Sequence, residues 1–372
     1  MPGPEIPEEA AASRGFSAPP TPVEGKEPVD TRCLVLTSGR AADGPYGVDQ
    51  LRQLGYELME VEPAAGGVHR KVRDVLEHRS GRPLDKALRS VPLAQQSDVV
   101  LAFLEKEALA ASWAKQRRLP PYAGRPLVMI ACWLADEICT MSSEERAAEV
   151  ARYRGVDLIL VLSRNQVDIL VDAGFAADRV EAVTFGYDPG QFPPALFEQR
   201  QGIVSVGADR GRDFTTLISA VDGSGLPLHL YTDPGHVQGL RLPPEVVFHG
   251  RVSFEHYRKV VATASVVAIP THKMAYPSGQ TVALEAAGTG ACLVLTDTPA
   301  MREYFTDETA VFVRPGDTEG WRKTLIDLDG DPERRRQLGD KAAALATEHL
   351  TYAHMWHQVD GALRQRGWTR RR

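Results

Sequence analysis

The residues best suited to chemistry lie in one stretch, YPSGQTVALEAAGTG at positions 276–290, which combines a turn, a helix start and one acid. The apolar pattern predicts a buried helix, yet Glu285 stands inside it. A buried carboxylate is costly unless it is hydrogen-bonded or bound by a ligand, and a diol could supply two hydroxyl donors. The alternative is that Glu285 lies on a solvated face of the helix.

The start of this helix could bind an anion. Its unpaired N–H groups and the positive end of its dipole suit a diphosphate. Gly279 would let a ligand come close to the backbone. The residues expected at this first turn are Ser278, Gly279, Gln280 and Thr281. An ordinary capped helix would show the same pattern, so both interpretations stay open.

Composition limits the class of protein. The chain has 372 residues, enough for two domains with sizeable cores, and its charged fraction of 25% is ordinary for a soluble globular protein. The net charge of -6 argues against a nucleic-acid partner, and the basic tail RQRGWTRRR is interpreted as a solvated end. Frequent Ala, Arg, Gly and Pro are typical of a GC-rich bacterial genome.

The cysteines, the apolar runs and the N-terminal residues bear on the cellular location of the protein. The four cysteines form no CxxC pair, which favours free thiols in a reducing cytoplasm. No run approaches the roughly 20 apolar residues of a membrane span. Residues 1–30 lack the features of a signal peptide, are rich in Pro, Glu, Ala and Ser, and are predicted to be disordered.

From residue 31 onward, short apolar runs alternate with amphipathic helices. A helix is expected at VDQLRQLGYEL, with Gly55 at its C-terminal end. Uniformly apolar strands between helices argue for parallel sheets covered on both faces. We predict an α/β chain of two doubly wound units, 31–190 and 200–350, joined by the proline-rich YDPGQFPPALFEQRQ. The expected strands are RCLVLTS, DVVLAFL, RPLVMIACW, VDLILVLS, VEAVTFG, GIVSVG, LPLHLYT, VVFHG, SVVAIPT, CLVLTD and AVFVR.

Three consecutive stretches carry a resemblance to a known family. VDLILVLSRNQVDILVDAGFAADRVEAVTFGYDPGQFPP, IVSVGADRGRDFTTLISAV and YPSGQTVALEAAGTGACLVLTDTPAMREYFTDETAVFVRPGD look like signatures of the family-four retaining glycosyltransferases. The first ends in a G-x-D-x-x-x-F-x-P phrase at Gly186, Asp188, Phe192 and Pro194. The resemblance covers roughly residues 120 to 350. It implies a GT-B fold, in which two Rossmann-like domains face across a cleft and the final helix, 351–366, packs back onto the first.

The resemblance also implies roles for residues. Glu285, in the phrase Leu-Glu-Ala, would hold the nucleotide ribose of the donor. Arg212 matches the family's phosphate-binding lysine, and its guanidinium suits bidentate phosphate contact. Ala208 stands where the family has an arginine, so Arg210 would substitute from the loop, beside Gly207 at the strand end. Two arginines on a solvated turn are the competing account.

One position departs from the family pattern. The family's first glutamate, which faces the donor sugar, is replaced by Pro277, eight positions before Glu285. We expect Ser278, Gly279 and Gln280, with His272 or Lys273 upstream, to line that part of the pocket.

The first half offers weaker candidates. Gly39 and Arg40 follow the first strand in a glycine-rich loop that could lie below the sugar or be a plain surface loop. Trp133 could stack on an acceptor ring or belong to the core. Asp136 or Glu137 could orient an acceptor hydroxyl, with a helix N-cap as the alternative.

The function that the resemblance implies is a retaining glycosyltransferase. It would move a hexose-type sugar from a nucleoside diphosphate donor to a hydroxyl or amine of a secondary metabolite, polysaccharide or lipid. No cofactor and no metal are expected, because arginines and amides can neutralise the leaving diphosphate. The alternatives are a nucleotide-sugar epimerase of the same architecture and an inactive nucleotide-sugar-binding partner. The chain lacks a GxGxxG turn and a GxxxxGK[ST] loop, which argues against an NAD enzyme or a P-loop ATPase.

Overall fold

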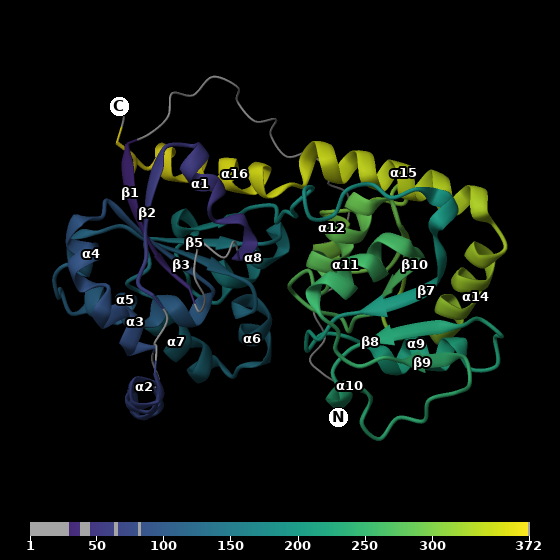
Figure 1. Ribbon diagram of the computed structural model, residues 1–372. Coiled ribbons are helices and arrows are strands. Elements are labelled where there is room, and N and C mark those ends of the chain that lie inside the picture. The colour runs from purple at the N-terminus through teal and green to yellow at the C-terminus, as the bar shows by residue number, and fades with distance from the viewer. Residues whose placement is uncertain (1–29, 38–44, 63–65, 81–82, 371–372) are drawn as a thin grey trace. The chain divides into compact units, whose positions relative to one another are not determined.

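The computed structural model describes residues 30–37, 45–62, 66–80 and 83–370 (Figure 1). The chain divides into two compact units. One comprises residues 30–184 together with 352–370, and the other is Phe185–Thr351. The predicted disordered segment, apart from Asp30, lies outside the described residues, as do Gly39 and Arg40.

The N-terminal unit is built on a parallel sheet of six strands in the order β2-β1-β3-β4-β5-β6. Alternate side chains of its apolar strands, such as Val100 and Met129, enter one core together with apolar residues of α5 and α6. The strands are β1 (Thr31–Leu36), β2 (Tyr56–Met59), β3 (Val99–Phe103), β4 (Leu127–Ala131), β5 (Leu158–Val161) and β6 (Val180–Ala182). The helices are η3 (Pro45–Gly47), α1 (Gln50–Gln53), α2 (Gly67–Ser80), α3 (Leu84–Arg89), α4 (Val91–Gln96), α5 (Glu105–Gln116), η4 (Tyr122–Gly124), α6 (Leu134–Thr140), α7 (Ser143–Arg152), α8 (Arg164–Asp172) and η5 (Ala177–Arg179).

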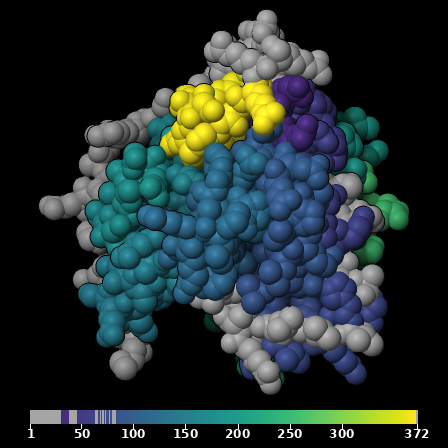
Figure 2. All heavy atoms as spheres, turned by 90° about the vertical axis from the view of Figure 1, so that its left-hand side faces the viewer, coloured from purple at the N-terminus to yellow at the C-terminus, as the bar shows by residue number. Residues whose placement is uncertain are grey.

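Helix α16 (Tyr352–Gln365), from the end of the chain, belongs to this same unit. Figure 2, which looks onto the N-terminal unit, shows this yellow segment beside the purple start of the chain. Trp356 is fully buried and its Nε1 donates to the carbonyl of Tyr46 at 2.9 Å. The hydroxyl of Tyr56 donates to Asp360 Oδ1 at 2.8 Å. The unit is therefore assembled from two segments far apart in the sequence.

The C-terminal unit repeats the architecture with the strand order β12-β11-β10-β7-β8-β9, all parallel. Helices α9 and α14 supply Leu217, Trp321 and Leu325 to a core that covers alternate strand residues. Helices α11 and α12 contact β10 and each other. The strands are β7 (Gln201–Val206), β8 (Leu228–Tyr231), β9 (Val246–Phe248), β10 (Ala264–Ile269), β11 (Cys292–Thr296) and β12 (Val311–Val313). The helices are η6 (Phe197–Gln199), α9 (Phe214–Val221), α10 (Pro234–Val237), α11 (Phe254–Thr263), α12 (Gln280–Thr289), α13 (Pro299–Arg302), α14 (Thr318–Asp329) and α15 (Pro332–His349).

The predicted fold class, α/β with two doubly wound parallel sheets, is confirmed, with one strand missed. The helix expected at VDQLRQLGYEL ends at Gln53, and Gly55, at φ +93°, turns the chain into β2. Tyr56 and Leu58 face the core while Glu57 is exposed, which is a strand pattern too short to separate from the helix by periodicity.

The proline-rich segment expected between the units packs into the C-terminal unit. Phe192 is buried, with ring centroids 6.1 Å from Phe254 and 5.9 Å from Tyr257. The amide of Tyr187 donates to the carbonyl of Leu350 at 3.0 Å. The chain passes from one unit to the other between residues 184 and 185, and again between 351 and 352.

Candidate functional site

Arg212 is a buried cation at the carboxyl end of β7. Its side chain lies on the loop between β7 and α9, and the residue is 6% exposed. Nη2 donates to the carbonyl of Val206 at 2.8 Å, whereas Nε and Nη1 have no hydrogen-bond partner among the described residues. Burial lowers the pKa of Arg212 to about 10, so the guanidinium keeps its charge near neutral pH. Because unpaired buried charge is costly, this arrangement indicates a site for an anion.

Two glycines make the room for this guanidinium. A Cβ on Gly207, at φ +137°, would lie 2.4 Å from Arg212 Nη2. A Cβ on Gly279, at φ +80°, would lie 3.0 Å from Arg212 Nη1 and 2.5 Å from Ile269 Cγ2. Neither position can take a side chain without displacing Arg212 or the sheet. The two predicted glycines therefore pack against the predicted arginine, although Gly279 comes from a distant loop.

The first turn of α12 lies at the same place, because Gly279 is its N-cap residue. Ser278 and Gln280 are buried, and Gln280 Oε1 has no hydrogen-bond partner among the described residues. Thr281 follows, half-buried. The helix N-terminus and the unpaired arginine nitrogens together make one positively polarised region.

Glu285, one and a half turns into α12, is 7% exposed. Oε2 accepts a hydrogen bond from the hydroxyl of Tyr257 on α11. Burial raises the pKa of Glu285 to about 7, although the hydrogen bond from Tyr257 opposes the shift. The carboxyl group is thus held inside the unit with little help from the protein.

Tyr257 is the hydrogen-bond partner of Glu285, and its charge state also bears on Arg212. It is among the ionisable groups that influence the pKa of Arg212, together with Asp209 and Tyr276. Sequence reasoning missed Tyr257, because nothing in the pattern of α11 separates it from an ordinary half-buried aromatic residue.

Asp209 is the second residue that sequence reasoning missed. Its Oδ1 accepts hydrogen bonds from the Ser278 hydroxyl at 2.5 Å, the Tyr276 hydroxyl at 2.6 Å and the amide of Gly211 at 3.0 Å. Burial by itself would raise the pKa of Asp209, but these donors and the charge of Arg212 leave it below the usual value. The loop after β7 therefore brings an acid as well as a cation to the site.

Three other predicted residues lie at the edge of this group. The side chain of Arg210 is exposed on the loop that carries Arg212. His272 is 60% exposed, and its Nδ1 lies 3.8 Å from Asp213 Oδ2. Lys273 is exposed. The structure places all three on the surface near the buried residues and does not bury any of them with Arg212.

In the N-terminal unit, Asp136 and Glu137 lie half-buried in the first turn of α6. The alternative role of N-cap is wrong for both, because Trp133 occupies that position and has no side-chain cap. Glu105 serves the helix start instead. Its Oε1 accepts the amides of Cys132, Trp133 and Leu134 at 2.6, 2.5 and 3.0 Å. Trp133 is half-buried, and its Nε1 has no hydrogen-bond partner among the described residues.

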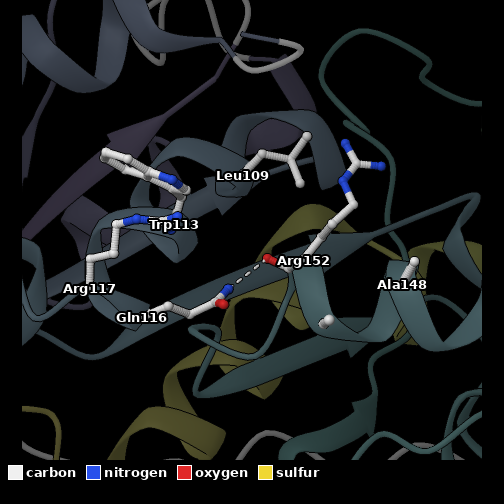
Figure 3. Close-up of a pocket in the computed structure, with 7 residues that line it drawn as sticks. Leu109, Trp113, Gln116, Arg117, Ala148 and Arg152 are labelled. Carbon is white, nitrogen blue, oxygen red and sulfur yellow. Dashed lines mark hydrogen bonds between the residues drawn. The ribbon is translucent and has the colours of Figure 1, made fainter.

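A separate pocket of about 180 Å³ lies between α5 and α7 of the N-terminal unit (Figure 3). The Arg117 guanidinium lies over the Trp113 ring at 4.6 Å, and Gln116 Nε2 donates to the carbonyl of Arg152 at 3.1 Å. Leu109, Ala148 and Ala151 complete the lining, which includes none of the predicted site residues.

Comparison with known proteins gives a sequence match and a set of fold matches. Residues 212–361 match the family described as "Glycosyl transferase-like". No curated protein shows significant sequence similarity to the chain. HepE from Anabaena, solved with UDP and glucose, is 14% identical, with TM-score 0.68 over 90% of this chain and 100% of its own. Sucrose-phosphate synthase from Thermosynechococcus elongatus is 16% identical, with TM-score 0.69 over 92% and 99%. A trehalose-6-phosphate protein from E. coli, bound with UDP-2-fluoro glucose, is 12% identical, with TM-score 0.64 over 89% and 98%.

The fold matches confirm the fold class as that of GT-B proteins. The predicted enzyme class, glycosyltransferase, agrees with the family match. The matched residues begin at Arg212 and include α12 with Glu285. Among the described helices, none combines the length and apolar character that crossing a bilayer requires.

Proposed function

We propose that this protein is a glycosyltransferase that binds a nucleoside diphosphate sugar in its C-terminal unit and transfers the sugar to an acceptor. One observation carries the proposal. The charged guanidinium of Arg212 is buried beside the start of α12 with two of its nitrogens unpaired among the described residues. A diphosphate would pair this charge and accept hydrogen bonds from the helix N-terminus at the same time.

Glu285 is proposed to hold the ribose. Its carboxyl group receives one hydrogen bond, from Tyr257, while a carboxylate can accept about four. The two hydroxyls of a ribose would supply donors and favour the ionised form, whose formation burial otherwise opposes. Binding of the nucleotide would therefore satisfy a group that the protein leaves under-satisfied.

The reaction follows from the same charges. The bond between the sugar and the diphosphate breaks through an oxocarbenium-like transition state, and negative charge develops on the leaving phosphate. Arg212 and the α12 amides stabilise that charge, with Arg210 on the exposed rim of the loop. A phosphate oxygen of the leaving diphosphate can take the proton from the attacking hydroxyl or amine. The acceptor then attacks the anomeric carbon from the face that the diphosphate leaves, so the anomeric configuration is retained. Since the protein supplies the cations, we expect full activity in the presence of EDTA.

The partners are proposed from chemistry and from the fold matches. HepE is described in complex with UDP-glucose, which makes UDP-sugars the first donors to test. The acceptor is a secondary metabolite, polysaccharide or lipid, with Asp136 proposed to orient its hydroxyl. The cysteines Cys33, Cys132, Cys139 and Cys292 are all free thiols, which supports the expected cytoplasmic location.

The test is a thermal-shift screen with UDP-, GDP-, dTDP- and ADP-sugars, followed by an assay of nucleoside diphosphate release. We expect one nucleotide class to raise the melting temperature by a few degrees at saturation. Glu285→Ala should remove this shift, whereas Glu308→Ala, a change at an exposed glutamate of the same unit, should keep it. Release that depends on an added acceptor indicates transfer, whereas conversion of the nucleotide sugar to its epimer, without net release of nucleoside diphosphate, would favour the epimerase alternative. No shift with any nucleotide, and a shift that survives Glu285→Ala, would each contradict the proposed site.

A further inference from the structure

The cluster formed by Asp209, Tyr276 and Ser278 is not accounted for by nucleotide binding. A carboxylate next to a phosphate site is unfavourable by charge, since like charges repel. Yet two buried hydroxyls and one backbone amide donate hydrogen bonds to this acid. The third glycine of the site, Gly211, belongs to the arrangement, because a Cβ there would lie 2.6 Å from Ser278 Oγ and 3.0 Å from Asp209 Oδ1.

The place of the cluster in the sequence is informative. Tyr276 and Ser278 flank Pro277, the position where the resembled family carries its sugar-facing glutamate. Proline offers no donor and no acceptor in its side chain, so the acid is missing from this loop. The two flanking hydroxyls instead donate hydrogen bonds to Asp209, an acid on the loop after β7.

The chemistry of Asp209 leaves one oxygen available. All three donors reach Oδ1, and no described residue donates to Oδ2. Asp209 is partly exposed, and its pKa is lowered, so the group is a carboxylate at neutral pH. It also lies near the charge of Arg212. Such an oriented, ionised oxygen near the proposed phosphate site can accept a hydrogen bond from a hydroxyl of the sugar that is joined to the phosphate.

We propose that Asp209 replaces the acid lost at Pro277 and determines which donor sugar is accepted. Its Oδ2 accepts a hydrogen bond from one hydroxyl of the sugar, while Tyr276 and Ser278 hold the carboxylate in orientation. The inference rests on the proposed function, and it assigns sugar recognition to a residue outside α12.

The test compares each nucleotide with its sugar nucleotide by calorimetry, using UDP with UDP-glucose and GDP with GDP-mannose. In Asp209→Asn we expect affinity for the sugar nucleotide to fall roughly 10- to 100-fold, the loss of one hydrogen bond to a charged group. Affinity for the nucleotide itself should stay within about threefold. Deoxy-sugar donors identify the contacted hydroxyl, because the variant and the wild type should bind the matching deoxy analogue equally.

One further variant tests the residues that orient Asp209, and another serves as a control. Tyr276→Phe removes one donor to Oδ1 and keeps the carboxylate, so it should weaken sugar discrimination less than Asp209→Asn. Asp222→Asn, at the exposed far end of α9, is the matched control and should change neither affinity.

Distinct outcomes would overturn the inference. Equal loss of nucleotide and sugar nucleotide in Asp209→Asn would make Asp209 a support of the loop only. Tighter binding of both would make it a group that repels phosphate. Either result leaves the proposed function standing, whereas a wild-type protein that binds neither pair contradicts the proposed function itself.

Discussion

The two units each bury a glutamate near a helix start, and the two glutamates are satisfied very differently. Glu105 and Glu285 are 6% and 7% exposed, and burial raises the pKa of both carboxyl groups. In the N-terminal unit, three backbone amides donate to Glu105. In the C-terminal unit, one phenol donates to Glu285.

This difference separates an acid whose hydrogen bonds the protein supplies from an acid that we propose binds a ligand. Glu105, on α5, binds the end of β4 and the start of α6, and its Oε1 accepts three hydrogen bonds. Glu285 has acceptor capacity left over, and Arg212 in the same unit has donor capacity left over. Burial and a shifted pKa are common to both glutamates, so the number of hydrogen-bond partners is the property that points to a ligand.

The largest expected effect comes from removing the unpaired cation. Arg212→Met should reduce the kcat of sugar transfer by about 100- to 1000-fold, since the charge proposed to stabilise the leaving phosphate is lost. The ligand-free protein should unfold at the same or a higher temperature, because a buried unpaired charge is replaced by an apolar side chain. The matched control is Arg314→Met, at a side chain that is 84% exposed in the same unit. A large loss of stability with unchanged kcat would make Arg212 a structural residue like Glu105.

A paired substitution tests the comparison directly. Glu285→Gln should weaken UDP binding by about 10- to 100-fold, because the amide offers the proposed ribose contact one uncharged acceptor oxygen in place of two charged ones. Glu105→Gln should lower the free energy of unfolding by about 1–3 kcal/mol, since its amides lose a charged acceptor, and leave UDP affinity unchanged. Calorimetry and urea unfolding measure the two quantities. The distinction fails if both variants lose affinity alike.

The remaining prediction is a pH dependence of stability. The pKa of Glu285 is raised by burial from its usual 4.5 to about 7 in the folded protein, so between these pH values the folded state holds a proton that the unfolded state has lost. Stability should therefore fall as pH rises from about 4.5 to 7, by up to ~3 kcal/mol, and then level off. Relative to wild type, Glu285→Gln should gain stability across this window, as measured by urea unfolding at pH 5 and pH 8. Equal pH profiles would show that Glu285 is already ionised or solvated.

The sequence allowed the fold to be predicted, together with about half of the residues that the structure brings together in the candidate site. Apolar runs identified eleven of the twelve strands in the described residues, because buried parallel strands have a distinct composition. Arg212, Gly207, Gly279 and Glu285 could be selected through their motifs. The partners Tyr257 and Asp209 could not be found, because their roles depend on contacts between loops and helices that no local pattern encodes. Pro277 was visible as a departure, but its neighbours' hydrogen bonds to Asp209 were not.

The packing of α16 has a consequence for dissecting this protein. Within the described part of the chain, the C-terminal unit is one uninterrupted segment, Phe185–Thr351, and can be cloned as a single fragment that retains Arg212, Asp209 and Glu285. The other unit cannot be isolated by a single cut, since a fragment stopping at residue 184 would leave Tyr56 without Asp360 and would expose the surface that Trp356 covers. Fusing residues 352–370 behind residue 184 through a short linker would restore both contacts within one polypeptide.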